Sequence, residues 1–92
     1  MAQAEAAVHL EVGVLHNGMT RNVRYHRRET GHALFERACH VFEIKPPERG
    51  PLALFLPDNA TEVRPDVTVE EAGVHPETTL ILRPREASTG VA

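Results

Sequence analysis

The sequence predicts an α+β fold in which one helix packs across a mixed β-sheet. Three observations lead to this prediction. Apolar and polar residues alternate with a period of two in the first part of the chain and again near its end, as in half-buried strands. Between about residues 30 and 43 the apolar residues recur instead at helical spacing. A chain of 92 residues is long enough for one hydrophobic core, so these segments form a single domain.

The first two strands are expected to form a hairpin. The apolar residues of the first strand occupy every second position: Val8, Leu10, Val12 and Val14. Asn17 and Gly18 follow, and this pair favours the two positive φ angles of a type I′ turn. The second strand is therefore expected over about residues 19–26, with Val23 and Tyr25 facing the core.

A helix is expected from Thr30 to about Glu43. Thr30 is a suitable N-cap because its hydroxyl can accept a hydrogen bond from a free amide of the first turn. Two prolines, Pro46 and Pro47, end the helix, because the residue before a proline is displaced from the helical region. The apolar stripe of this helix consists of Leu34, Ala38, Val41 and Phe42.

Four shorter elements are expected after the helix. An apolar run predicts a third strand, and Val63 marks a brief further one. A cap at Thr68 and an exit at Gly73 predict a single helical turn, and a last alternating segment closes the sheet. In chain order, these elements are expected at residues 52–56, 62–64, 67–74 and 78–83. This order of hairpin, crossing helix and return to the sheet is that of a β-grasp fold.

The two ends of the chain carry little apolar sequence. Residues 1–7 lack the basic region and the apolar core of a secretory signal, so we expect a disordered N-terminal lead. Residues 86–92 offer too little apolar surface to offset the entropy of ordering, so we expect a flexible C-terminal tail. The folded domain is therefore expected to span residues 8–85.

Composition restricts the setting and the partners. The net charge is −3 and the basic residues are spread out, so no nucleic-acid partner is expected, and the basic run at residues 21–28 is interpreted as the solvated face of a strand. No segment approaches the roughly 20 apolar residues of a membrane span. The single cysteine, Cys39, indicates that there is no disulfide framework, which favours a reducing, cytoplasmic setting. We expect a monomer.

Nothing in the sequence makes a positive case for an enzyme. Its six histidines show no metal-ligand spacing, so neither a metal nor another cofactor is expected. Cys39 and His40 resemble a nucleophile–base pair only in sequence, because neighbouring side chains of a helix point about 100° apart. Cys39 is instead interpreted as a small, partly buried side chain.

Two stretches resemble the ubiquitin-like protein family. The first, GVHPETTLILRPR at residues 73–85, is similar to the family's closing segment, where a charged turn ends in Ser or Thr and a Leu-x-Leu strand leads into an arginine-bearing tail. The second, IKPPERGPLALFL at residues 44–56, resembles the family's Ile-Pro-Pro-acidic connection between the helix and the third strand. The resemblance covers about residues 8–90, and the arginine-rich, lysine-poor composition suggests a bacterial source.

The resemblance implies a covalent modifier. In such proteins the carboxylate of a terminal glycine is activated and transferred to an amine. Gly90 is expected to have this role after a protease removes Val91 and Ala92, and the other partners would be activating and conjugating enzymes. Glycine suits a narrow channel because it has no Cβ. The family's Gly-Gly is replaced here by Thr89 and Gly90, so the protease must differ from the ubiquitin type, and Arg85 is the expected tail arginine that an activating enzyme reads.

A second expectation is a protein-binding patch on the sheet. Alternation leaves Phe55 and Ile81 facing outward on neighbouring strands, where they would form one exposed apolar surface. The alternative is that the register or an overlying loop buries Phe55. Lys45 is the only lysine, so a chain of linked copies would be limited to Lys45, the α-amine or an ester.

Two other functions are open on the sequence alone. A non-covalent binding or adaptor module, like the small ubiquitin-like proteins of bacterial secretion systems, would need no processing of residues 86–92. A sulfur carrier would hold a thiocarboxylate at Gly90, although such carriers usually end in Gly-Gly without an extension. The fold does not decide among these functions. An activating-enzyme homologue and a protease beside the gene would favour the modifier, and secretion genes would favour the adaptor.

Overall fold

A computed structural model describes residues 9–85 of the chain. The expected lead and tail therefore lie outside the described residues. The four strands form one sheet in the order β2-β1-β4-β3, in which β4 runs parallel to β1 and the other neighbours are antiparallel. The elements are β1 (His9–His16), β2 (Met19–His26), α2 (Gly31–Val41), the short 3₁₀ helix η1 (Pro46–Glu48), β3 (Leu52–Phe55) and β4 (Thr79–Pro84).

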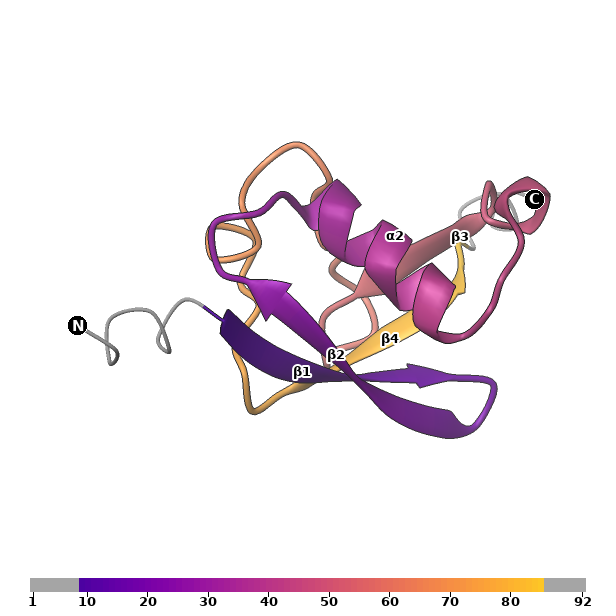
Figure 1. Cartoon of the computed structure of the whole chain (residues 1–92), viewed down its shortest axis with the longest axis horizontal. Coiled ribbons are helices and arrows are strands. Elements are labelled where there is room, and N and C mark those ends of the chain that lie inside the picture. Colours follow the sequence, from indigo (N-terminus) through magenta and orange to yellow (C-terminus); the bar gives the residue numbers. More distant parts are fainter. Residues whose placement is uncertain (1–8, 86–92) are drawn as a thin grey trace.

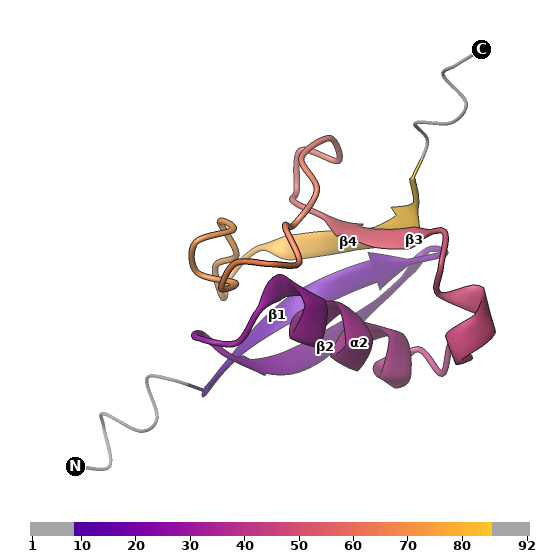
Figure 2. The same cartoon turned by 90° about the horizontal axis from the view of Figure 1, so that it is seen from above.

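Helix α2 lies across one face of the sheet (Figures 1 and 2). The hydrophobic core fills the space between them, and burial of its apolar surface is the main favourable term in folding. The core residues are Val12, Val14, Val23, Tyr25, Leu34, Ala38, Cys39, Leu54, Val63, Val69, Val74, Leu80 and Leu82. This arrangement confirms the predicted α+β fold, a β-grasp with a mixed sheet.

The hairpin of β1 and β2 has the predicted turn. Asn17 and Gly18 take φ angles of 51° and 81°, and a type I′ turn requires positive values at both positions. The hairpin closes directly around this pair, so β2 spans the predicted residues 19–26. Val23 and Tyr25 are each 1% exposed, as the alternation predicted.

Helix α2 begins where the sequence predicted but ends earlier. The hydroxyl of Thr30 accepts a hydrogen bond from an amide of the first turn (3.2 Å), which confirms Thr30 as the N-cap. The last helical residue is Val41 rather than Glu43. Glu43 takes a φ of 58°, and the amide of Ile44 donates to the carbonyl of Cys39 (2.9 Å). These are the features of a Schellman motif, which ends the helix at this point.

Replacing Glu43 by glycine should stabilise the protein. A residue with a Cβ is strained in the left-handed region, and glycine at this position avoids the strain. We expect the free energy of unfolding, measured by urea denaturation, to rise by about 0.5–1 kcal/mol. Glu43→Gln keeps the Cβ and removes only the charge, so it should leave the stability unchanged. An equal gain in both variants would assign the effect to charge and contradict this explanation.

The chain between β3 and β4 consists mainly of turns. Residues 69–73 form a single turn within the predicted range 67–74, in which the amide of Ala72 donates to the carbonyl of Thr68 (2.9 Å). The amide of Glu71 donates to the hydroxyl of Thr68 (3.1 Å) and the amide of Thr68 donates to the Glu71 carboxylate (3.2 Å), so Thr68 is the predicted cap. Gly73 provides the predicted exit with a φ of 93°. The strand expected at residues 62–64 is reduced to a single bridge to β3, because the following residues bend away to contact the start of α2.

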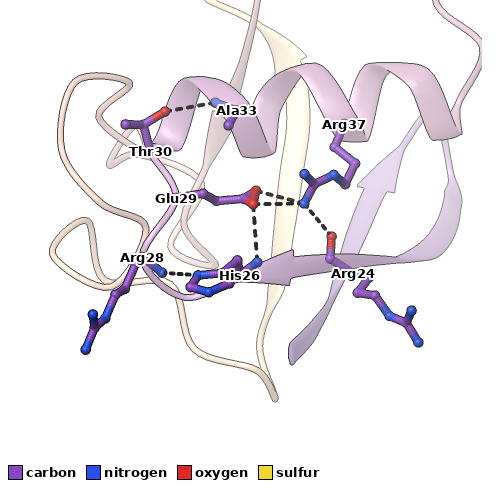
Figure 3. Close-up of polar contacts among 7 residues, drawn as sticks. All are labelled: Arg24, His26, Arg28, Glu29, Thr30, Ala33 and Arg37. Carbon is purple, nitrogen blue, oxygen red and sulfur yellow. Dashed lines mark hydrogen bonds and ion pairs between the residues drawn. The ribbon is translucent and has the colours of Figure 1, made fainter. Parts of the chain in front are cut away.

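An ion pair holds α2 against the end of β2 (Figure 3). The guanidinium of Arg37 donates to both carboxylate oxygens of Glu29 (3.0 and 2.8 Å) and to the carbonyl of Arg24 (3.0 Å). The Glu29 carboxylate also accepts from the amide of His26 (3.3 Å). The side chains of Arg24 and Arg28 point away from this contact, and both residues are exposed. Arg24 therefore lies on the solvated face of β2, as interpreted from the sequence, whereas Arg27 and Arg28 follow the end of the strand and Arg27 is half-buried.

Candidate functional site

Arg85, the last described residue, lies beside the start of β3. The amide of Arg85 donates to the carbonyl of Pro51 (2.9 Å). Its guanidinium donates to the two oxygens of the Glu62 carboxylate at 2.7 and 3.1 Å. Arg85 is thus paired within the domain, and its recognition by an activating enzyme stays a prediction. The other expected processing residues, 89–92, lie outside the described part of the chain.

The contact between Glu62 and Arg85 shifts the pKa values of both groups. The hydrogen bond from Arg85 holds the pKa of the Glu62 carboxyl below its usual range, and the same bond raises the pKa of the guanidinium. The two side chains are 33% and 48% exposed, so water screens the pair and its contribution to stability is modest. The pair joins Arg85, the last described residue, to the segment that follows β3.

The contribution of this pair should be lost in acid. A carboxyl with a lowered pKa binds a proton less readily in the folded state than in the unfolded chain. Its contribution is therefore present above the unfolded pKa of about 4.3 and is lost as the pH falls through the folded pKa. The melting temperatures of the wild type and Glu62→Gln should differ at neutral pH and converge at an acidic pH well below the ordinary range of a glutamate carboxyl. A difference that is the same at both pH values would contradict this role.

The structure corrects the expected apolar patch at Phe55 and Ile81. The two residues are cross-strand partners on β3 and β4, as expected. However, Phe55 is only 6% exposed and Ile81 is half-buried. The guanidinium of Arg83 lies 3.8 Å from the centre of the Phe55 ring. It also donates to the side-chain oxygen and to the carbonyl of Asn59 (2.6 and 3.0 Å), so the arginine and the loop after β3 cover this face.

The physical reason for the correction is the chemistry of arginine. Arg83 lies two residues after Ile81 on β4, so both side chains are on the same face of the sheet as Phe55. A planar guanidinium stacks on an aromatic ring while its edge still reaches hydrogen-bond acceptors. Among residues 9–85, the exposed large hydrophobic side chain is Met19, at 53%, and it lies on β2, away from this strand pair.

The other candidate residues lie at separate places. Lys45, the expected acceptor lysine, is exposed just before η1. Cys39 is fully buried rather than partly buried, and burial raises the pKa of its thiol, which disfavours a nucleophilic thiolate. Within residues 9–85, no group of three or more His, Cys, Asp or Glu side chains is placed to hold a metal ion. No helix in that range is long and apolar enough to cross a membrane.

The sequence patterns did not indicate a groove that lies between α2 and β3. Its volume is about 290 Å³. The apolar part of its lining includes Phe35, Leu52, Leu54 and Val63. Two ion pairs also line it: Glu36–Arg49 (2.9 Å) and Glu62–Arg85 (2.7 Å). The signal present in the sequence was Phe35, an aromatic residue outside the predicted apolar stripe of the helix.

Several solved structures have the same fold, whereas no protein-family model and no curated protein matches the sequence. A de novo protein designed from ubiquitin is 29% identical, with a TM-score of 0.69 over 85% of this chain and 90% of that one. Ubiquitin from Caldiarchaeum subterraneum is 16% identical, with a TM-score of 0.66 over 84% of this chain and 94% of that one. A chain of the MycP5-free ESX-5 inner membrane complex is 20% identical, with a TM-score of 0.69 over 85% of this chain.

These similarities show a ubiquitin-like β-grasp fold. The match covers nearly the whole of the small ubiquitin but only 21% of the ESX-5 chain. The same fold therefore occurs both as a separate small protein and as one part of a much longer chain. Because one fold serves many functions, the function must be argued from the surfaces and from the tail.

Proposed function

We propose that this chain is a ubiquitin-like protein modifier, cleaved after Gly90 and joined to an amine of another protein through the Gly90 carbonyl. The observation that carries this proposal is the position of Arg85, which Pro51 and Glu62 hold at the end of the domain. Gly90 follows five residues later. Five extended residues span at most about 18 Å, which suffices to bring a carboxylate into an enzyme channel while the domain stays outside.

The proposed chemistry is a series of acyl transfers at Gly90. Its carboxylate first forms an acyl bond to the phosphate of a nucleotide, with release of pyrophosphate. A cysteine thiol of the enzyme then displaces the nucleotide, and an amine finally displaces the thiol to form an amide. This chain supplies the carboxylate and the surfaces that bind the enzymes, and the partner enzymes supply the catalytic groups. Thr89, with its restricted χ1, requires a processing protease different from the ubiquitin type.

Truncations of the tail test this proposal in the native host. A chain with an N-terminal epitope tag should lose residues 91–92 and appear in adducts of higher mass. A chain truncated after Gly90 should still form adducts, because it needs no protease, whereas one truncated after Thr89 should form none. Gly90→Ala should reduce the adducts because the added Cβ obstructs the channel. The matched control, Ser88→Ala, should leave them unchanged. Adducts that persist after truncation at Thr89 would rule out attachment at Gly90.

A non-covalent adaptor is the second candidate, and the groove between α2 and β3 favours it. The groove provides a binding surface that does not depend on residues 86–92. A domain of this fold also occurs in a chain of the ESX-5 inner membrane complex. For an adaptor, truncation after Arg85 should leave partner binding intact. A sulfur carrier would instead form no adducts and would show sulfur in place of one Gly90 carboxylate oxygen in its intact mass.

A further inference from the structure

We propose that Asn17 is a site of spontaneous chemical modification, at which its side-chain amide is lost as ammonia and aspartate or isoaspartate is formed. The reaction consumes one water molecule and needs no enzyme, because both reacting groups belong to the turn between β1 and β2. The inference uses no residue after Arg85, so it does not depend on the modifier function.

The chemistry is a ring closure followed by hydrolysis. The backbone nitrogen of Gly18 forms a bond to Cγ of Asn17, and its proton passes through water to the side-chain nitrogen. The bond between Cγ and Nδ2 then breaks, ammonia leaves with the bonding electron pair, and a five-membered succinimide ring remains. Water adds to one of the two carbonyls and opens the ring. Opening at the backbone carbonyl gives isoaspartate, and opening at Cγ gives aspartate.

The surroundings of Gly18 leave room for this ring. Gly18 has no side chain, and a Cβ built at its position would meet no atom within 4 Å. Asn17 and Gly18 are both exposed. The ladder of the hairpin ends at the pair of His16 and Met19, and within residues 9–85 the amide of Gly18 donates no hydrogen bond. The attacking nitrogen is therefore accessible, and no described residue holds it.

The side chain of Asn17 is held only weakly. The ring of His16 donates from Nδ1 to the carbonyl of Leu82 (3.0 Å), and in this tautomer its Nε2 accepts from the side-chain amide of Asn17 (3.4 Å). The second distance is longer than the range of about 2.7–3.2 Å that is usual for an N–H···O hydrogen bond. The amide that reacts can therefore rotate away from His16.

Ring closure requires the turn to open. In a closed type I′ turn the first central residue has a ψ of about 30°, which places the Gly18 nitrogen on the opposite side of the Cα–C bond from the Cβ of Asn17. Rotation about this bond brings the nitrogen to Cγ. Few buried contacts oppose the rotation, because the first four residues of β2, 19–22, are all exposed. We therefore expect the tip of the hairpin to open more readily than the centre of the sheet.

Asn59 lies in a comparable turn but is protected. It is exposed and has a φ of 60°. The next residue is Ala60, whose Cβ hinders the attack and whose amide donates to the Asp58 carboxylate (2.9 Å). The side-chain oxygen of Asn59 accepts from Arg83 (2.6 Å). Both reacting groups are therefore held in place at this turn, in contrast to those of Asn17.

The third asparagine, Asn22, is protected by the sheet. The residue that follows it, Val23, is β-branched and 1% exposed, and it pairs with Val12 on β1. A branched side chain crowds the attacking nitrogen. Ring closure at Asn22 would also require the hairpin to open along half its length. Asn17 is therefore the asparagine of this chain that is expected to react first.

The two products change the hairpin in different ways. Both add a carboxylate beside a cavity of about 280 Å³ between the turn and the end of α2, which Arg21 and Phe42 also line. Isoaspartate in addition lengthens the backbone by one methylene group, so the loop no longer has the geometry of a two-residue type I′ turn. Because His16 binds the carbonyl of Leu82, this distortion would reach β4 as well.

Timed incubation of the full chain at neutral pH, followed by digestion with trypsin and mass spectrometry, tests this proposal. Trypsin places the three asparagines in separate peptides, residues 1–21, 22–24 and 50–64. We expect the first peptide to gain the mass difference between OH and NH₂, with fragment ions that place the change at Asn17, while the other two stay unchanged. A methyltransferase specific for isoaspartate should methylate the incubated protein, with S-adenosylmethionine as the methyl donor. A sample digested without incubation gives the background.

Ala60→Gly is the matched variant, because it gives the second turn the same Asn-Gly pair. We expect Asn59 of this variant to keep its amide while Asn17 of the same molecule loses it. Equal loss at both positions would show that the dipeptide alone sets the rate, which would overturn the structural argument. No change at Asn17 above the background would overturn the site itself.

Asn17→Asp separates the added charge from the longer backbone. The isoaspartyl form, isolated by anion exchange, should unfold at a lower urea concentration than both the wild type and Asn17→Asp. Equal midpoints for the isoaspartyl form and Asn17→Asp would contradict the expected distortion of the turn. None of these results depends on adducts at Gly90, so this proposal and the modifier function fail separately.

Discussion

Gly31→Ala should be among the most destabilising single substitutions in this chain, lowering the free energy of unfolding by about 2–3 kcal/mol. A Cβ at Gly31 would overlap the carbonyl oxygen of Arg64. That carbonyl belongs to a segment that is hydrogen-bonded to the start of α2. The amide of Gly31 donates to the carbonyl of Val67 (2.9 Å), and the amide of His32 donates to the carbonyl of Pro65 (3.1 Å). The segment cannot retreat from an added methyl group without loss of these hydrogen bonds.

Urea denaturation of Gly31→Ala and Gly50→Ala measures this effect against a matched control. Gly50 has open space where its Cβ would lie, so its substitution should change stability by no more than about 0.5 kcal/mol. Equal stabilities of the two variants would show that α2 does not approach the Arg64 backbone this closely. Gly31 also lines the groove between α2 and β3. Equal stabilities would therefore also show that the wall of the groove at Gly31 does not lie where the structure places it.

Phe55→Ala should lower the free energy of unfolding by about 3 kcal/mol, as expected for a buried phenylalanine. The ring is 6% exposed and lies under the guanidinium of Arg83. An exposed patch residue would behave differently, since surface substitutions usually change stability by no more than about 0.5 kcal/mol. The free energy of unfolding in urea therefore decides whether Phe55 is covered or free to bind a partner.

Arg83→Met separates the apolar contact over the Phe55 ring from the contribution of the charged guanidinium and its hydrogen bonds. Methionine keeps an apolar side chain over the ring but removes the charge and the hydrogen bonds to Asn59. We expect a loss of about 1 kcal/mol, since a cation near an aromatic ring at a partly exposed site contributes about that much. If Phe55→Ala were nearly neutral and Arg83→Met were also neutral, the arginine would not cover the ring in solution.

The elements that the sequence predicted correctly depend on local chemistry. Asn17 and Gly18 require positive φ angles for a two-residue turn, which fixes the register of the hairpin. Thr30 caps the helix through an amide only three residues away. The capping box at Thr68 is equally local. Together with the period of the apolar residues, these short-range features were enough to predict the β-grasp fold.

The features that the sequence did not predict depend on contacts between distant residues. The side chains of Phe55 and Arg83 meet because two strands pair in a particular register, and the loop that holds the arginine turns at Asn59, which has a φ of 60°. Alternation showed that Phe55 faces outward but not what covers it. The groove needs α2, β3 and the segment at Val63 together, so no periodicity in one element indicates it.

Mass spectrometry of the adducts tests most directly the claim that Gly90 is the point of attachment. Trypsin cleaves after Arg85 and would leave residues 86–90 on the modified amine. The expected product is a peptide of another protein whose lysine carries the branch Glu-Ala-Ser-Thr-Gly in amide linkage. If residues 86–92 are recovered only as one unbranched peptide from cells that express the neighbouring genes, Gly90 is not conjugated and the modifier function is contradicted.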